Sequence, residues 1–359
     1  MSGELALVTG GGGFLGRAIV EQLLTAGYRV RSFARSAYPE LAAMGVEVVR
    51  GDLVDEAAVH RACEGCAIVF HNAARAAVWG ERRDFYPPNV RGTQNVLATC
   101  RAAGVRRLVY TSTASVVFGR HDICGGDESL PYPPVPASPY AATKAVAEQM
   151  VLAADGATLR TLSLRPHLIW GPGDTQIIPR LIAKARAGRL VRVGCGRNVV
   201  DTTYVDNAAA AHIRAADALL HNPAAHGRAY FISNGEPVNL WDLIDRIMAV
   251  ADLPPVRRAV PAPLAIGVGT VIERTHASLR LRGEPQLTRF LAEELATSHW
   301  FDISAARREL GYDPSVSIDE GLAHLGVWLQ SSASGVATDH TTRRRLRRAA
   351  RLHGGHRLL

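Results

Sequence analysis

The first half of the chain alternates short apolar segments with longer segments in which apolar residues recur at helical spacing. This alternation predicts strands that are each followed by a helix, which is typical of a parallel sheet covered by helices on both faces. We interpret as strands the segments Leu5–Thr9, Val30–Ala34, Glu47–Arg50, Ile68–His71, Arg107–Thr111 and Thr161–Arg165. Leu15, Ile19 and Leu23 then share one face of a helix over 14–26, which Gly27 ends.

The pattern changes near residue 170, and this change divides the chain. Beyond Gly171, helical stretches at 179–187, 207–220 and 240–251 alternate with turns rich in proline and glycine. We therefore expect an α/β domain over 1–170. A smaller, mainly helical lobe over 171–330 should be interleaved with it and close over a site.

Charge adds a third segment, 331–359. The chain has 359 residues, 47% of them hydrophobic, and a net charge of +8. Seven arginines and one acid lie in the last segment, so the rest of the chain carries 34 basic and 32 acidic side chains. We interpret this segment as a disordered basic tail and expect no nucleic-acid partner, with tail contact to anionic lipid or nucleic acid as the alternative.

Several classes of protein are disfavoured. The five cysteines are too scattered for a disulfide framework, and no closely spaced set of His and Cys predicts a metal site. The first strand begins almost at once, which argues against a signal peptide. The most apolar later segment, 263–272, is far shorter than the ~20 residues that span a bilayer. We expect a cytoplasmic protein with at most peripheral membrane contact.

A glycine-rich turn lies between the first strand and its helix. Gly10, Gly13 and Gly16 stand three residues apart. Glycine lets the backbone approach a pyrophosphate, and the amides at the start of the helix, at Phe14 and Leu15, face its negative charge. Because strand, turn and helix follow in this order, we predict a dinucleotide site in a Rossmann-type, doubly wound parallel sheet.

The end of the second strand indicates which dinucleotide is used. A site that selects NAD has a carboxylate there, but this chain has Arg35, and its first acid afterwards is Glu40. A guanidinium can bind a 2′-phosphate with its planar fork. We therefore predict a preference for NADP(H), with NAD(H) as the alternative.

The ends of the third and fourth strands add further cofactor contacts. Asp52 and Leu53 are placed to meet the adenine edge, although an isolated Asp in a turn is as often a cap. Asn72, Ala73 and Ala74 are small enough for the chain to pass beneath the nicotinamide ribose.

Tyr140 and Lys144 lie one helical turn apart, behind the helix start formed by Ser138 and Pro139. A phenol with a pKa near 10 is a poor acid at neutral pH, but an ammonium ~4 Å away contributes roughly 4 kcal/mol at an effective dielectric of 20. We predict that Tyr140 protonates an oxygen as hydride arrives. Lys144 should lower the pKa of Tyr140 and hold the nicotinamide ribose.

A third group should bind the same oxygen. The end of the fifth strand supplies hydroxyls, of which we choose Thr113, with Ser112 as the alternative. Sugar-nucleotide dehydratases need acids directly after this hydroxyl, whereas Ala114 and Ser115 follow here. Dehydration is therefore disfavoured.

These residues in this order resemble the extended short-chain dehydrogenase/reductase superfamily, over about residues 3–330. Segments 89–95, 165–174 and 204–207 support the resemblance, and 110–116 is similar to its 3β-hydroxysteroid dehydrogenase branch. The resemblance implies that Tyr140, Lys144 and Thr113 are catalytic. It also implies further residues at the cofactor, namely Asn89, Thr111, Pro166 and His167.

A narrower likeness concerns 77–80, 230–237 and 287–290, which resemble the reductases of 2-alkyl-3-oxoalkanoates in bacterial long-chain olefin biosynthesis. It implies NADPH-dependent reduction of a long-chain β-keto acid to a 2-alkyl-3-hydroxyalkanoate. It also implies work beside a condensing enzyme, a β-lactone synthetase and a β-lactone decarboxylase. A homodimer formed through the helices that begin near Asn89 and Tyr140 is implied as well.

Two other functions stay open, a 3β-hydroxysteroid or sterol dehydrogenase using NAD(P) and a non-catalytic dinucleotide sensor. A sensor is expected to lack the Tyr–Lys pair. For an apolar substrate we name as pocket candidates Trp79, Trp170, Ile177, Ile178, Leu181 and the segment 264–272, with core packing as the alternative. Candidate cations for a substrate carboxylate are Arg180 and Arg289.

Overall fold

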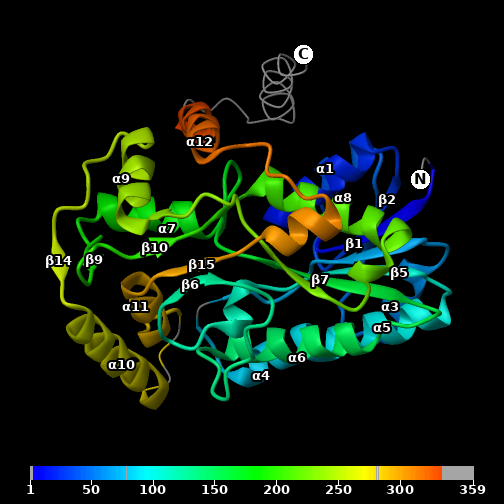
Figure 1. The fold of residues 1–359 in the computed structure, drawn as a ribbon, viewed down its shortest axis with the longest axis horizontal. Coiled ribbons are helices and arrows are strands. Elements are labelled where there is room, and N and C mark those ends of the chain that lie inside the picture. Colours follow the sequence, from blue (N-terminus) through cyan, green and yellow to red (C-terminus); the bar gives the residue numbers. More distant parts are fainter. Residues whose placement is uncertain (1–2, 78, 280, 282, 334–359) are drawn as a thin grey trace.

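A parallel seven-stranded sheet forms the centre of the larger part of the molecule (Figure 1). The computed structural model describes residues 3–77, 79–279, 281 and 283–333. In spatial order the strands are β12 (Ala229–Ile232), β7 (Arg160–Pro166), β5 (Arg107–Thr111), β4 (Ile68–His71), β1 (Leu5–Thr9), β2 (Arg29–Ala34) and β3 (Glu47–Arg50). The order reverses between β4 and β1, where such sheets open a crevice at the carboxyl ends of their strands. The predicted fold class is confirmed.

Helices cover both faces of this sheet (Figure 1). On one face α1 (Phe14–Thr25) packs against α8 (Val205–His221), and on the other lie α3 (Glu56–Cys63), α5 (Gly92–Ala102) and α6 (Pro139–Ala153). Along β1 the side chains alternate, with Ala6 and Val8 in the core under α1 and Leu5 and Leu7 in the core under α3 and α5. Because both faces are buried, β1 and β5 are almost continuous apolar runs.

Shorter elements connect these layers. They are the helices α2 (Pro39–Ala42) and α4 (Arg82–Tyr86), a π-helical segment at Pro87–Arg91, and 3-10 turns at Ala114–Val117 and Pro223–Ala225.

The smaller lobe contains a sheet that the sequence analysis did not predict. Its strands are β13 (Val238–Asn239), β10 (Val199–Val200), β15 (His299–Phe301) and β6 (Ile123–Gly126). Around it lie α7 (Ile177–Arg186), α9 (Leu240–Val250), α10 (Ala262–Ser278) and α11 (Arg289–Ala296), at the left of Figure 1. Two-residue strands pair β8 (Ile169–Trp170) with β11 (Thr203–Tyr204) and β9 (Arg192–Val193) with β14 (Ala259–Val260). A π-helical segment at Ala306–Leu310 and α12 (Ile318–Ala333) follow.

The two parts of the chain are interwoven. Helix α8 and strand β12 come from the second half of the sequence but complete the layers of the main sheet. Strand β6 comes from the first half and lies in the smaller lobe. The core under α1 continues without a break into that lobe, so the expected boundary near residue 170 does not separate two cores. Most of the expected basic tail, 334–359, lies outside the described residues.

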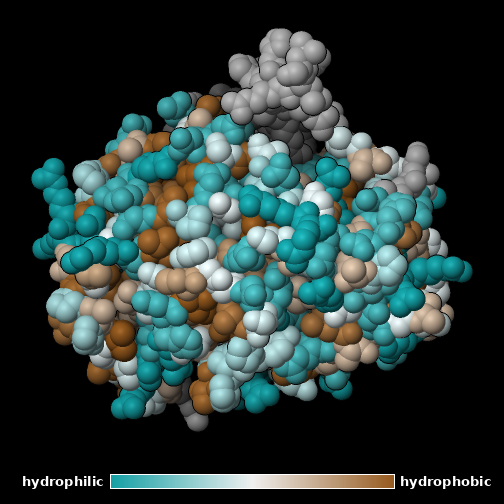
Figure 2. Space-filling view, viewed as in Figure 1, coloured by the Kyte–Doolittle hydropathy of each residue, from teal (hydrophilic) through white to brown (hydrophobic). Residues whose placement is uncertain are grey.

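The surface mixes hydrophilic and hydrophobic residues (Figure 2). On the face drawn there, brown patches are most frequent over the smaller lobe. Exposed apolar side chains on α10 include Leu264, Val268 and Val271. Among the described residues, no helix combines the length and apolar character needed to cross a membrane.

Helix α6 is anchored to the sheet by a buried ion pair. The Glu148 carboxylate, which is 0% exposed, accepts three hydrogen bonds from Arg165 on β7, the shortest 2.7 Å from Nη2. Ser163 and Tyr132 also donate to it. Burial alone would raise the pKa of Glu148, but the Arg165 guanidinium and these hydrogen bonds hold it below its usual value.

We predict that Glu148→Ala lowers the free energy of unfolding by about 3–5 kcal/mol, because Arg165 then stays buried without its carboxylate. Urea unfolding followed by circular dichroism measures the change. In the wild type, the contribution of Glu148 is present above its ordinary pKa and is lost as the pH falls through the lowered one. Arg83→Ala, which breaks an exposed pair with Glu81, should change stability little. Equal effects of the two variants would contradict the prediction.

Candidate active site

The glycine turn has the geometry that a pyrophosphate needs. Gly10 has a φ of 70°, which favours glycine, and a Cβ on Gly16 would collide with the Gly10 carbonyl oxygen. Helix α1 begins at Phe14 with no side-chain cap and no acid in its first turn. Its first amides, including those of Phe14 and Leu15, therefore remain available to an anion. The residues present fit a dinucleotide.

Arg35 directly follows β2 and is exposed at the carboxyl end of the sheet. Its main-chain oxygen accepts a hydrogen bond from Arg50, which ends β3. Asp52 Oδ1 accepts from the Val54 amide, so this carboxylate does cap its own turn. Leu53 is buried, and its carbonyl accepts from Asn95.

The segment after β4 lies against the glycine turn. The Ala73 backbone is so close to Gly10 that a Cβ on Gly10 would lie 3.0 Å from the Ala73 Cα. Asn72 and Ala74 flank this contact and are half-buried. His71 is held between Thr9 and Thr93, and burial lowers its pKa to about 3. His71 is therefore neutral and structural.

Tyr140 lies in the first turn of α6. Ser138 caps this helix by accepting from the Ala141 amide at 3.1 Å, and Pro139 occupies the first position. Burial raises the pKa of Tyr140 to about 12, and a hydrogen bond with Thr113 acts in the lowering direction. We expected Lys144 to lower the pKa of Tyr140, but in the structure this pKa is raised. Burial outweighs other influences here, and Lys144 is engaged elsewhere.

Lys144 is almost completely buried, with 2% exposure. Its Nζ donates to the Thr111 carbonyl oxygen at 2.6 Å and lies 4.1 Å from the centre of the Tyr110 ring. Burial lowers its pKa to about 7, against an opposing influence from Glu148. The ammonium is thus held at the carboxyl end of β5 and loses charge near neutral pH.

Thr113 lies beside Tyr140, close enough to act on its phenol. Its Oγ1 accepts from the Ser115 amide at 3.2 Å and so caps the short turn at Ala114–Val117. The alternative, Ser112, is buried, and its hydroxyl makes no hydrogen bond with a described residue. The geometry therefore favours Thr113 as the group that binds an oxygen beside Tyr140.

Asn89 connects the cofactor side with the catalytic helix. Its side-chain oxygen Oδ1 accepts a hydrogen bond from the main-chain N–H of Arg75 at 2.7 Å. Its Nδ2 donates to the Arg75 carbonyl oxygen and to the hydroxyl of Thr143, which lies between Tyr140 and Lys144 in the sequence. Both polar ends of the side chain are used within the protein. The geometry gives Asn89 a positioning role.

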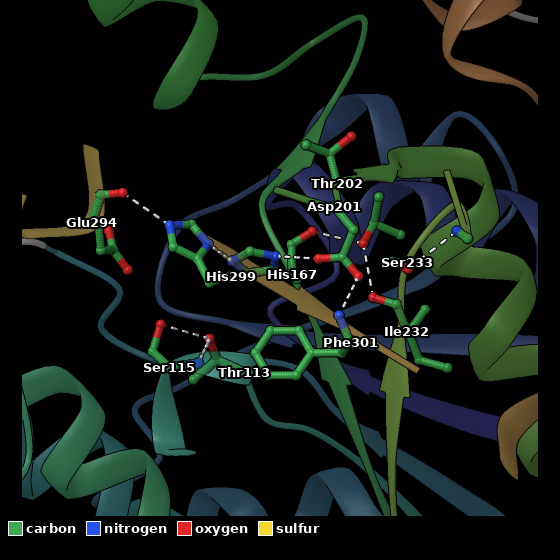
Figure 3. Close-up of polar contacts among 12 residues, drawn as sticks. Thr113, Ser115, His167, Asp201, Thr202, Ile232, Ser233, Glu294, His299 and Phe301 are labelled. Atoms are coloured by element: carbon green, nitrogen blue, oxygen red, sulfur yellow. Dashed lines mark hydrogen bonds and ion pairs between the residues drawn. The ribbon is translucent and has the colours of Figure 1, made fainter. Parts of the chain in front are cut away.

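Beyond Pro166, which ends β7, His167 begins a chain of buried polar groups (Figure 3). Its Nδ1 lies 2.6 Å from Asp201 Oδ1, and its Nε2 lies 3.1 Å from His299 Nδ1. His299 Nε2 in turn lies 2.9 Å from the Glu294 carbonyl oxygen. Both nitrogens of His167 are therefore bound within the protein, which leaves neither for a cofactor.

Sequence reasoning missed Asp201, Glu294 and His299. They come from a loop, from α11 and from β15, and no short motif contains two of them. Only the fold brings these three segments to the end of β7.

An apolar cavity of about 440 Å³ lies in the smaller lobe. The predicted pocket residues Trp170, Ile177, Ile178 and Leu181 line it, together with side chains of α9 and α11. Trp79 does not line it and packs edge-on against His276 of α10. Thr202, Glu294 and His299 also line the cavity.

The two predicted cations are already paired. Arg180 bonds Glu284 at 2.7 Å, and Arg289 bonds Glu293 at 2.7 Å. Lys184, which also lines the cavity, donates to the Gln286 carbonyl oxygen and makes no ion pair with a described residue.

Residues 7–261 match the profile of the 3-beta hydroxysteroid dehydrogenase/isomerase family. The chain belongs to this family. The predicted superfamily and branch are thereby confirmed, and so is the prediction of an oxidoreductase acting on a CH–OH or C=O group.

Two curated members of the family are similar over most of their length. The chain is 53% identical to the 2-alkyl-3-oxoalkanoate reductase of Stenotrophomonas maltophilia, over 89% of this chain and 97% of that protein. It is 48% identical to the protein of the same name from Shewanella oneidensis, over 89% of this chain and 85% of that protein.

A solved structure supports the cofactor class. The structure described as MoeE5 in complex with UDP-glucose and NAD superposes with a TM-score of 0.70 at 25% identity, over 92% of this chain and 100% of that one. Together with the family, it confirms the predicted use of a nicotinamide dinucleotide. The preference for NADPH stays a prediction.

We predict that Tyr140→Phe lowers kcat for ketone reduction by about 10²- to 10⁴-fold, because the proton donor is lost. Dinucleotide affinity, measured by fluorescence titration, should stay within a few-fold. Tyr86→Phe, which removes an exposed phenol on the neighbouring helix α4, is the matched control and should leave kcat unchanged. Normal turnover by Tyr140→Phe would exclude this tyrosine as the acid.

Proposed function

We propose that the chain reduces the 3-oxo group of a long-chain 2-alkyl-3-oxoalkanoate to a 2-alkyl-3-hydroxyalkanoate with NADPH. The names of the two similar curated proteins support this substrate. The observation that carries the proposal is the apolar cavity, because one of its lining residues, Glu294, is close enough to Tyr140 to raise the pKa of that phenol. An alkyl chain in the cavity would therefore bring its polar end to the candidate acid.

Each group of the proposed site has a separate role in the reaction. The glycine turn and the start of α1 bind the pyrophosphate, and Lys144 lies where the nicotinamide ribose is expected. The bound dinucleotide supplies hydride. Tyr140 donates its proton to the ketone oxygen, which Thr113 holds by a hydrogen bond. The raised pKa of Tyr140 keeps this phenol protonated until the oxygen gains charge.

The second candidate function is dehydrogenation of a 3β-hydroxysteroid or sterol. The description of the family favours it, and a cavity of this size and apolar character is compatible with a fused ring system. A non-catalytic dinucleotide sensor is disfavoured, since the chain has both Tyr140 and Lys144, one helical turn apart on α6.

We further propose that the chain works beside a condensing enzyme, a β-lactone synthetase and a β-lactone decarboxylase, and forms a homodimer through α5 and α6. The reaction class supports the first part, because a 2-alkyl-3-oxo acid is the product of condensing two acyl chains. The packing of α5 against α6, with Val146 exposed on α6, supports the second.

Purified protein should oxidise NADPH in the presence of a 2-alkyl-3-oxoalkanoate and form the 2-alkyl-3-hydroxyalkanoate, identified by mass spectrometry. A 3β-hydroxysteroid with NAD⁺ or NADP⁺ should give a kcat/KM at least about tenfold lower, because a pocket contact differs by 1–3 kcal/mol per misfitted group. Faster turnover of the steroid would establish the second candidate. No turnover of either substrate would refute both.

Arg35→Asp is expected to lower kcat/KM for NADPH by about 10- to 100-fold, because a charge-assisted hydrogen bond of 1.5–3 kcal/mol is lost. The value for NADH should stay equal or rise, since a carboxylate there can accept from the ribose 2′-hydroxyl. Arg29→Asp, at the opposite end of the same strand, serves as the control and should change neither value. An unchanged ratio in Arg35→Asp would show that the preference does not depend on this residue.

A further inference from the structure

Glu294 is the one charged side chain lining the apolar cavity that makes no hydrogen bond or ion pair with another described residue. The other charged side chains there, Arg180, Lys184 and Glu284, all have partners. The main-chain oxygen of Glu294 is bound by His299, and its side chain extends away from that contact, toward the side of Figure 3 where Thr113 and Ser115 lie. A carboxyl group that lines an apolar cavity without a hydrogen-bond partner is unfavourable, unless a ligand supplies that partner.

The backbone of Glu294 is fixed by the chain of histidines behind it. A carbonyl oxygen can only accept, so His299 Nε2 donates to Glu294. Burial lowers the pKa of His299 to about 4, so its ring is neutral and Nδ1 must accept from His167 Nε2. The other ring nitrogen of His167, Nδ1, donates to Asp201, which also accepts a hydrogen bond from the Phe301 amide. The end of α11 is thereby tied to the loop at Asp201 and to β7.

We propose that Glu294, in its protonated form, donates a hydrogen bond to the substrate carboxylate and so selects a 3-oxo acid over a neutral ketone. This inference rests on the proposed function. In a 3-oxo acid the carboxyl carbon is two bonds from the carbonyl carbon. A substrate whose ketone oxygen meets Tyr140 and Thr113 therefore places its carboxylate within a few ångströms of the reaction centre, where the Glu294 carboxyl acts on Tyr140.

Two carboxyl groups in contact cannot both be ionised at low cost, and they share one proton instead. Binding would therefore take one proton from solvent onto Glu294 whenever it is ionised in the free protein. No proton is transferred to the hydroxy acid product through this contact, because Tyr140 supplies the one that reduction requires.

The surroundings of Glu294 allow this protonation near neutral pH. Burial raises its pKa to about 7, and the positive charge of His167 acts in the opposite direction. Tyr140 of α6 faces it as a neutral phenol, and His299 of β15 as a neutral ring. On α11 itself, Arg289 and Glu293 neutralise each other, and Glu293 also pairs with Arg120.

The other charged side chains that line the cavity, among the described residues, each make a hydrogen bond or an ion pair. Helix α9 contributes only apolar side chains to the lining. Across the cavity Arg180 is paired with Glu284, and Lys184 donates to the Gln286 carbonyl. On α10, Glu273 accepts from the Arg289 amide.

The test measures binding rather than turnover. The probes are the stable product 2-octyl-3-hydroxydodecanoate and its methyl ester, titrated by calorimetry into the protein saturated with NADP⁺, from pH 6 to 9, in buffers of different ionisation enthalpy. For the acid, Kd should be constant below about pH 7, rise about tenfold per pH unit above it, and show uptake of nearly one proton at pH 8. The ester should show no proton uptake.

Glu294→Gln keeps a hydrogen-bond donor but cannot titrate. It should bind the acid at pH 8 as tightly as the wild type does at pH 7 or more tightly, without proton uptake. Glu294→Ala, which lacks the donor, should bind it at least about tenfold more weakly than Glu294→Gln. Glu284→Gln removes a paired carboxyl of the same cavity, and it should keep the proton uptake of the wild type.

Two results would overturn the role of Glu294 and leave the proposed reductase function standing. One is proton uptake that persists when Glu294→Gln binds the acid, and the other is uptake by the wild type that is the same for the ester as for the acid. Failure of the wild type to bind either probe at any pH would overturn both. Correct circular dichroism spectra and NADP⁺ affinity of each variant establish that it is folded.

Discussion

The site depends on one constraint, the placement of three ionisable side chains on one face of helix α6, two of them buried and Tyr140 half-buried. Tyr140, Lys144 and Glu148 follow one another at four-residue spacing and point to the end of the central sheet. Each is satisfied by a different part of that sheet, through Thr113, the Thr111 carbonyl and Arg165. A shift of the helix by one turn would leave a buried ammonium and a buried guanidinium without acceptors, so the same contacts that stabilise the fold set the position of the phenol.

The smaller lobe is fixed to this centre by a second buried polar chain. Asp201, His167 and His299 join a loop, the end of β7 and strand β15. His299 also lines the cavity, together with apolar side chains of α7, α9 and α11. Hydrogen bonds of this kind have one arrangement, whereas apolar contacts tolerate several. The polar chain therefore fixes the position of His299 in the cavity wall, and the apolar side chains decide what kind of molecule fills the cavity.

Much of the larger part of the molecule could be predicted from the sequence, because its signals are local. Six of the seven central strands and the helix after the glycine turn lie within one residue of their predicted bounds, and Tyr140 lies where the Ser138 cap predicts it. Strand β12 escaped notice because its partner β7 lies more than 60 residues earlier. Glu294 and His299 are separated from Tyr140 by more than 150 residues, and no motif contains them. The prediction that Lys144 lowers the pKa of Tyr140 was wrong in direction. The spacing of the two residues reveals a nearby cation but not the loss of solvent that raises the pKa of the phenol.

That raised pKa bears on the direction of the reaction. Reduction requires the phenol in its protonated form as an acid, whereas oxidation of an alcohol requires the phenolate as a base. Burial and the charge of Glu294 both favour the protonated form, and only the Thr113 hydrogen bond opposes them. The protein's own groups thus hold Tyr140 ready to give a proton. A Glu294 carboxyl that shares one proton with a substrate carboxylate leaves the pair with one negative charge, so binding of an acid keeps this influence on the pKa of Tyr140. The phenol therefore stays protonated in the complex with an acid until the ketone oxygen gains charge.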